Sequence, residues 1–238
     1  MTTDLSLSKP TPETATAGDP RPVADSPPRI VLASKSPRRA DLLRRIGLDF
    51  AVMPGDIDET YLPGEAPRAH AERLAREKAA IIGSVEPEAH VIGSDTIVVI
   101  DGRVLGKPAD ASESAKMLAT LSGREHTVMT GVAIAHAGQV VSGVEEVRVR
   151  FRSLSPGEWS EYAATGEPLD KAGSYGIQGY GSTVVEWIEG DYFAVMGLPI
   201  VRLLGLFKRL GWRYAFAAGF VRDVHDPDSD PDDSPRSF

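Results

Sequence analysis

The chain has 238 residues, of which 42% are hydrophobic and 25% are charged, as in a globular protein with a substantial core. The absence of cysteine excludes disulfides and thiolate metal sites and fits a reducing compartment. No apolar leader and no membrane-length apolar run is found, so we expect a cytoplasmic protein without a membrane partner.

The net charge of −8 is concentrated at the two ends of the chain. Both ends are rich in Pro, Ser, Thr and Asp and poor in large apolar side chains, which predicts disordered tails at 1–28 and 221–238. The near-neutral remainder, expected to be one domain at 29–220, lacks the basic stripe that binds nucleic acid. We therefore expect no nucleic-acid partner.

Strands and helices alternate between the tails and predict an α/β fold, a single domain with a mixed β-sheet and flanking helices. In chain order we expect a strand at 29–33, a helix at 37–46, a strand at 50–53, a helix at 67–82, a strand at 91–100 ending in an Asp101-Gly102 hairpin, a helix at 110–121, strands at 126–135 and 139–151, a helix from Ser155, a strand at 183–188 and a closing helix after Pro199.

The first strand leads into the first helix through Ser34-Lys35-Ser36-Pro37-Arg38-Arg39. Ser36 is placed to cap the helix, and Pro37 suits its first position. Two arginines there meet the positive end of the helix dipole, which is unfavourable unless an anion binds. The stretch is therefore either a polyphosphate site or an ordinary capped helix with solvated arginines.

Polar residues interrupt the apolar strand at 91–100, where Ser94-Asp95-Thr96 stands. A carboxylate at this position is costly unless it is paired, binds a metal or lies at an exposed strand end. The alternative is an Asp that caps a turn. After the hairpin, the chain would return Lys107 alongside Asp95.

Three further features are weaker signals. Asp56, Asp58 and Glu59 form either an acidic metal-binding loop or a solvated one, and the solvated alternative is favoured for the two aspartates. Lys78 would ordinarily be a surface lysine. The stretch G-S-Y-G-I-Q-G-Y-G is glycine-rich but lacks the ending of a P-loop. The histidines lack zinc-ligand spacing, so we expect a hard cation, Mg²⁺ or Mn²⁺.

Several short sequence blocks, which follow one another in matching order from Ile30 to about Leu210, resemble the Maf family of nucleoside triphosphate pyrophosphatases. They are L-A-S-K-S-P-R-R, I-D-E-T, L-A-R-E-K-A, G-S-D-T-I-V, G-K-P, T-G-V-A, D-K-A-G-S-Y-G-I-Q-G and G-D-Y-F-A-V-M-G-L-P. The resemblance implies hydrolysis of the bond between the α and β phosphates with a divalent metal. It also implies an elongated Maf/ITPase-like architecture around a nucleotide-binding cleft, and a homodimer.

The resemblance also assigns roles to individual residues. Asp95 matches the proton acceptor, and with Glu59 it would contact the metal. Arg38, Thr96 and Gln178 match positions that set the base preference. The substrate-binding positions as a whole are Ser34, Arg38, Arg39, Lys78, Thr96, Lys107 and Gln178.

Thr96 and the G-I-Q-G stretch look like the dTTP/UTP branch of the family, not the 7-methyl-GTP branch. Two other functions stay open: a nucleotide-binding regulator of cell division and septum formation, and a nucleotidyltransferase. Turnover is favoured over binding alone because Asp95, Glu59, Lys78 and Lys107 are all present. A transferase would need an acceptor substrate, so pyrophosphate release from the nucleotide alone separates it from a hydrolase.

Overall fold

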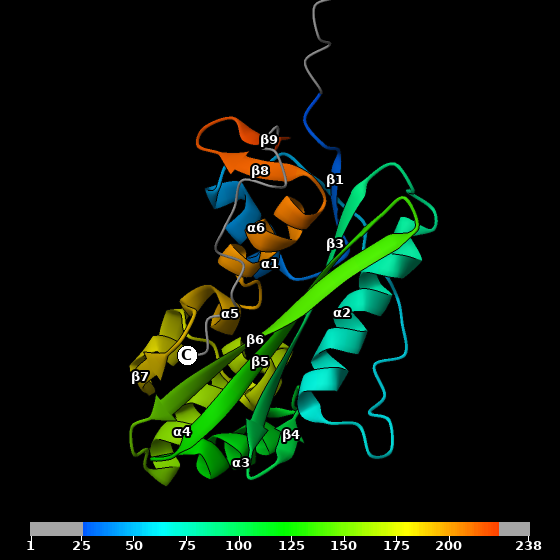
Figure 1. Cartoon of the computed structure of the whole chain (residues 1–238). Helices are drawn as coiled ribbons and strands as arrows, with labels where there is room; N and C mark the ends of the chain where they lie inside the picture. The colour runs from blue at the N-terminus through cyan, green and yellow to red at the C-terminus, as the bar shows by residue number, and fades with distance from the viewer. Residues whose placement is uncertain (1–25, 224–238) are drawn as a thin grey trace, which may run out of the picture.

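The computed structural model describes residues 26–223, and most of both expected tails lies outside this range. A seven-stranded sheet in the order β2-β1-β3-β5-β6-β7, with β4 beside β3, forms its centre (Figure 1). Strand β1 pairs in parallel with β2 and β3, and the other pairs are antiparallel, so the predicted mixed sheet is confirmed. The strands are β1 (Ile30–Leu32), β2 (Ala51–Val52), β3 (His90–Ile100), β4 (Arg103–Leu105), β5 (Glu125–His136), β6 (Gln139–Phe151) and β7 (Val185–Glu189).

The helices divide between the two faces of the sheet. Helix α2 (Pro67–Gly83) runs along β3 and β5 on one face (Figure 1). The other face carries two groups of elements at opposite ends, α1 and α6 with a second small sheet, and α3 with α4. The second sheet consists of β8 (Trp212–Ala215) and β9 (Gly219–Arg222). The helices, with the short helix α5, are α1 (Pro37–Arg45), α3 (Ala111–Leu121), α4 (Pro156–Ala164), α5 (Tyr192–Met196) and α6 (Ile200–Arg209).

Successive side chains of β3 point to opposite faces of the sheet, so this one strand contributes residues to three hydrophobic clusters. Val91 packs in the cluster that includes α2 residues. Ile92, on the opposite face, belongs to the core beneath α1 and α6, and Val98 to the core beneath α3 and α4. Between these two cores the same face carries Ser94 and Thr96. The polar residues that interrupt the strand therefore mark the boundary between two hydrophobic cores.

Helix α2 lies close to the sheet because two glycines face it. A Cβ atom on Gly93 would lie 2.2 Å from the Ala75 carbonyl oxygen, and one on Gly131 would lie 2.2 Å from that of Ala71. No side chain fits between the backbones at these points, so both positions require glycine. The short separation lets a side chain of α2 reach the middle of β3.

Several expected boundaries need correction. The helix after Pro199 is not the last element, because α6 is followed by the β8–β9 hairpin, in which Trp212 and Phe220 are buried. Strand β9 reaches Arg222, so residues 221 and 222, which the sequence placed in the acidic tail, pair with β8. Ser36 occupies the position before α1, but its side chain makes no capping hydrogen bond.

Three short 3₁₀ helices and α5 were also not predicted, because each is five residues or shorter and lacks a periodic apolar pattern. The 3₁₀ helices are η1 (Glu167–Asp170), η2 (Ala172–Ser174) and η3 (Gly179–Thr183).

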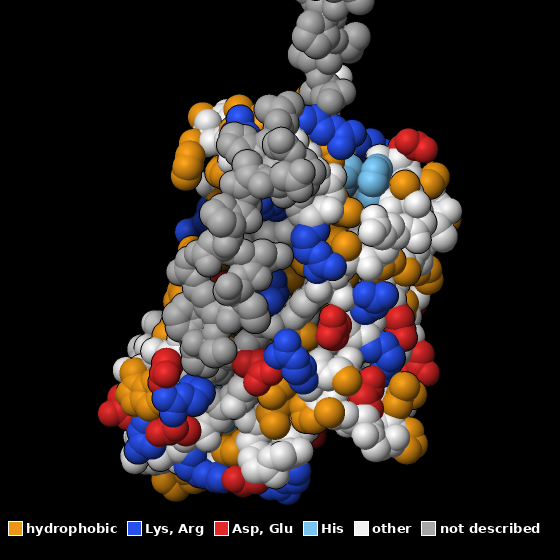
Figure 2. Space-filling view, viewed as in Figure 1, with side chains coloured by type: hydrophobic (Ala, Val, Ile, Leu, Met, Phe, Trp, Pro, Cys, Tyr) orange, Lys and Arg blue, Asp and Glu red, His pale blue; other side chains and the backbone are white. Residues whose placement is uncertain are grey.

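Basic and acidic side chains are interspersed on the face shown in Figure 2. Ion pairs cross between β6 and β7, as in Arg150 with Glu186 at 3.3 Å and Arg148 with Glu189. Within residues 26–223, no helix is long and apolar enough to cross a membrane.

Replacing Gly93 with alanine should destabilise the fold by about 1–3 kcal/mol, because the added methyl would push α2 away from β3. Gly205→Ala in α6 is the matched control. Apart from the neighbouring residues and backbone of its own helix, no atom of residues 26–223 lies within 4 Å of the place that its methyl group would take, so this variant should be neutral or stabilising. Chemical denaturation of both variants measures the difference. Equal stability would contradict the close contact.

Candidate active site

A cleft of about 940 Å³ opens where the two cores separate. It is lined by the β1–α1 connection, the loop after β2, one side of α2, the middle of β3 and residues 170–178. All residues predicted from the sequence to form the site line it: Ser34, Arg38, Arg39, Glu59, Lys78, Asp95, Thr96, Lys107 and Gln178. Positions far apart in the sequence therefore meet in one cavity.

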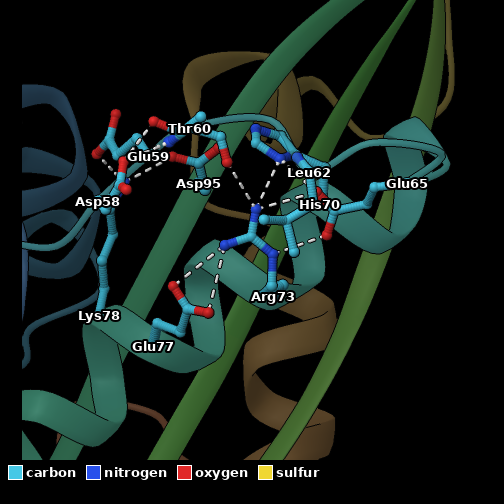
Figure 3. A network of polar contacts seen from close by, with 10 residues as sticks. All are labelled: Asp58, Glu59, Thr60, Leu62, Glu65, His70, Arg73, Glu77, Lys78 and Asp95. Carbon is cyan, nitrogen blue, oxygen red and sulfur yellow. Dashed lines mark hydrogen bonds and ion pairs between the residues drawn. The ribbon is translucent and has the colours of Figure 1, made fainter.

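Lys78 joins the two carboxylates of the cleft. Its Nζ lies 2.6 Å from Asp95 Oδ1 and 2.6 Å from Glu59 Oε1 (Figure 3). The side chains of Lys78 and Asp95 are 10% and 11% exposed. A buried ammonium requires such partners, because the uncompensated charge is costly in a low-dielectric interior. The alternatives of a surface lysine and a turn-capping aspartate are both excluded by this contact.

Helical spacing explains why Lys78 is buried. Leu74, Lys78 and Ile82 repeat every four residues on the face of α2 that packs against the sheet. Asp95 lies two residues beyond Gly93 on β3 and so projects to the same side of the sheet. Lys78 is therefore directed inward, toward a carboxylate.

Cations around Glu59 keep this carboxylate ionised. Burial acts to raise the pKa of Glu59, but the hydrogen bond from Lys78 and the charges of Lys78, Lys107 and Arg39 outweigh it. The net result is a pKa below the usual value for glutamate. Glu59 is therefore an anion over the physiological pH range, available to a cation or to a lysine.

Arg39 is held by neutral acceptors. Its Nε donates to the Gly197 carbonyl oxygen at 2.7 Å, and its two terminal nitrogens donate to Ser34 Oγ at 3.0 Å and Thr96 Oγ1 at 3.2 Å. Burial lowers the pKa of the Arg39 guanidinium from its usual value. Within residues 26–223 no carboxylate forms an ion pair with it, so its charge is directed into the cleft and remains available for an anion.

Arg38 points to the opposite wall. Its Nη1 lies 2.9 Å from Asp170 Oδ2, and Lys171 Nζ lies 2.7 Å from Asp170 Oδ1. Asp170 is thus shared by two cations, and a competing anion could replace it at either. Asp170 and Lys171 were missed as cleft residues, although both stand in the D-K-A-G block used for the resemblance.

The glycine-rich stretch forms the wall that carries Gln178. Glu167 accepts the backbone N–H groups of Tyr180 at 2.9 Å and Gly181 at 3.0 Å. The Tyr162 hydroxyl donates to the same carboxylate at 2.9 Å and accepts the Gly176 N–H at 3.2 Å. The glycine-rich stretch therefore forms tight turns, and these turns also place Gln178 against the cleft.

The charges in the cleft nearly cancel without a ligand. The acidic lining residues are Asp56, Asp58, Glu59, Asp95 and Asp170, and the basic ones are Lys35, Arg38, Arg39, Lys78, Lys107 and Lys171. A polyphosphate with several negative charges would therefore leave a deficit of positive charge that a divalent cation can supply.

Glu59 and Asp95 fit a hard cation because both are oxygen donors that meet at one point, the Lys78 ammonium. Within residues 26–223, no group of three or more His, Asp or Glu side chains is arranged to hold a metal. A cation at this position would need further oxygen ligands from phosphate or water, which is the usual way in which Mg²⁺ is bound.

A family model described as "Maf-like protein" matches residues 29–210, most of the chain. The chain belongs to the Maf family. The family resemblance found in the sequence motifs is thereby confirmed, and every residue that those motifs predict for the site lines the cleft.

Among Maf relatives, a protein of Moorella thermoacetica named dTTP/UTP pyrophosphatase is 52% identical over 185 residues, covering 77% of this chain and 95% of the relative. A protein of Pyrococcus abyssi with the same name is 50% identical over 184 residues, covering 77% and 97%. Among solved structures, the Ham1 protein of Staphylococcus aureus aligns with 66% of this chain and 79% of its own, at 14% identity and a TM-score of 0.40.

Replacing Lys78 with glutamine should raise the pKa of Glu59. Burial, the largest influence on this carboxyl, acts upward and would no longer be opposed by the Lys78 ammonium. An NMR titration of the side-chain carboxyl carbons measures the shift, with the exposed Lys116→Gln as control. An unchanged Glu59 pKa in Lys78→Gln would contradict the pairing.

Proposed function

We propose that this Maf protein hydrolyses dTTP and UTP to the nucleoside monophosphate and pyrophosphate. The observation that carries the proposal is the Asp95 carboxylate, held at 2.6 Å by Lys78 in a cleft that also contains Arg38 and Arg39. This arrangement places a proton acceptor beside several phosphate-binding cations. The names of the relatives from Moorella thermoacetica and Pyrococcus abyssi support the substrate class.

Arg39 has the strongest structural support as a phosphate ligand. The hydroxyl groups of Ser34 and Thr96 and the Gly197 carbonyl fix its guanidinium without neutralising it. A preorganised cation costs little reorganisation when the anion binds. The start of α1 adds backbone N–H groups with no helical partner, and these favour a phosphate at the same place.

Asp95 would act as the general base. Its carboxylate would accept a proton from the water that attacks the α-phosphorus, and the electron pair of the broken bond would leave on the pyrophosphate. The Lys78 ammonium, beside Asp95, would stabilise the negative charge that develops during the attack. Lys107, at the exposed side of the cleft, is available to the leaving pyrophosphate.

Glu59 and Asp95 are the residues that would hold Mg²⁺ or Mn²⁺. Such a cation, when bound with phosphate oxygens, supplies Lewis-acid polarisation and neutralises charge on the phosphates. Because Lys78 joins the same two carboxylates, it would keep them close together before the cation arrives.

Gln178 is suited to reading a pyrimidine base. Its side-chain amide both donates and accepts hydrogen bonds, which matches the imide edge of uracil and thymine. Arg38 and Thr96 would contribute to base preference, as the resemblance implies. Thr96 Oγ1 also accepts a hydrogen bond from Arg39 Nη2 at 3.2 Å, so Thr96 would act through Arg39 as well. Cytoplasmic location and pairing of two copies stay predictions.

A panel of nucleoside triphosphates, canonical and modified, assayed for pyrophosphate with Mg²⁺ and Mn²⁺ tests the proposal. We expect dTTP and UTP to have the highest kcat/KM. Preference for ATP, GTP or 7-methyl-GTP would refute the assignment to the dTTP/UTP branch. Binding without pyrophosphate release would favour the regulatory alternative, and release only with an added acceptor would favour a nucleotidyltransferase.

Asp95→Asn should reduce hydrolysis by about 10²–10⁴-fold, because the amide cannot accept the proton from water. Nucleotide binding, measured by calorimetry, should persist, since the variant removes a negative charge near the triphosphate. Asp101→Asn, at the exposed hairpin where Asp101 pairs with Arg124, is the matched control and should keep the wild-type rate. Near wild-type hydrolysis by Asp95→Asn would remove Asp95 from the mechanism.

A further inference from the structure

Glu59 reaches the site from a loop that has no helix or strand between β2 and α2. Half of its side chain is exposed, at 51%. A carboxylate on such a loop loses conformational freedom whenever it binds a ligand, and this entropy loss weakens the binding of that ligand. The position of Glu59 therefore depends on what fixes the loop.

A buried carboxylate six residues further on fixes the loop to α2. Glu65, with a side chain 9% exposed, accepts Arg73 Nε at 2.7 Å and Nη2 at 2.9 Å in a bidentate pair. His70 Nδ1 lies 2.9 Å from the same carboxylate. Arg73 Nη2 also donates to the Thr60 carbonyl oxygen at 3.1 Å, so it holds the residue directly after Glu59 (Figure 3).

Some contacts of Arg73 stay within α2, whereas others join α2 to the loop that carries Glu59. Its pair with Glu77, at 3.3 Å, lies within one helix and is an ordinary i, i+4 surface interaction. The contacts with Glu65 and Thr60 instead join the helix to the loop. Hydrogen bonds from Arg73 have the largest effect on the Glu65 carboxyl and lower its pKa to about 2. Burial acts in the opposite direction, but hydrogen bonds from His70 and the Leu62 N–H add to the lowering. This carboxylate is therefore ionised at any pH at which the enzyme would work.

We propose that Glu65 and Arg73 form a clamp that positions Glu59 for the cation and phosphates in the cleft. The Glu65–Arg73 clamp does not line the cleft and acts through the backbone at Thr60, so both are positioning residues, not catalytic ones. The inference rests on the proposed function, because it assigns Glu59 to the same site.

The test compares Glu65→Gln with the control Glu77→Gln, which removes the other partner of Arg73 and leaves the loop contacts intact. In Glu65→Gln we expect kcat for dTTP to fall roughly tenfold and the Mg²⁺ concentration for half-maximal rate to rise by a similar factor. Glu77→Gln should keep both wild-type values. Arg73→Lys should retain part of the activity lost in Arg73→Gln, since lysine keeps the positive charge that pairs with Glu65.

A double-mutant cycle with Glu59→Gln separates positioning from general destabilisation. If the clamp acts through Glu59, adding Glu65→Gln to Glu59→Gln should leave the single-turnover rate unchanged within about twofold. A further loss of about tenfold would overturn the proposal.

Amide hydrogen exchange of residues 56–62 gives a readout independent of turnover. We expect faster exchange in Glu65→Gln and wild-type exchange in Glu77→Gln, and equal protection in all three proteins would also overturn the clamp. If the wild-type protein hydrolyses no nucleotide, the proposed function fails, while the exchange measurement still decides whether the clamp orders the loop.

Discussion

A positive charge buried against the sheet governs the structure of the cleft. The Lys78 ammonium is stable there because Asp95 and Glu59 both contact it, and removing one partner of a buried pair typically costs about 3–5 kcal/mol. The pairing fixes a strand, a helix and a loop relative to one another. It also holds two carboxylates next to one another, which suits the binding of a hard cation.

The sheet provides the geometry that this pairing needs. Gly93 and Gly131 allow α2 to approach closely enough for Lys78 to reach β3. On the opposite face, the hydroxyl groups of Ser94 and Thr130 donate to the backbone carbonyls of Gly197 and Ala194 and so attach α5 between the two cores. The cleft therefore lies where hydrophobic packing is interrupted on both faces, and the polar residues that interrupt it are hydrogen-bonded to their surroundings.

Much of the fold and of the cleft could be predicted from the sequence. The long strands and helices have clear periodicity, and the misplaced arginines and the Asp within an apolar strand indicated a site. The β8–β9 hairpin and α5 could not be predicted, because short elements depend on tertiary packing. Glu65 and Arg73 were missed because Glu65 lies in the loop before α2, and its contact with Arg73 depends on how that loop folds against the helix. Helical spacing places Lys78 on the buried face of α2, but its contact with Asp95 also depends on the close approach that the glycines across from α2 allow, and local sequence does not reveal that approach.

In the proposed reaction, water attacks the α-phosphorus of the nucleotide. Hydrolysis of dTTP in ¹⁸O-labelled water, followed by mass spectrometry of both products, tests it directly. We expect one ¹⁸O atom in the phosphate of the monophosphate and none in the pyrophosphate. Label in the pyrophosphate, or release of orthophosphate as the first product, would contradict it.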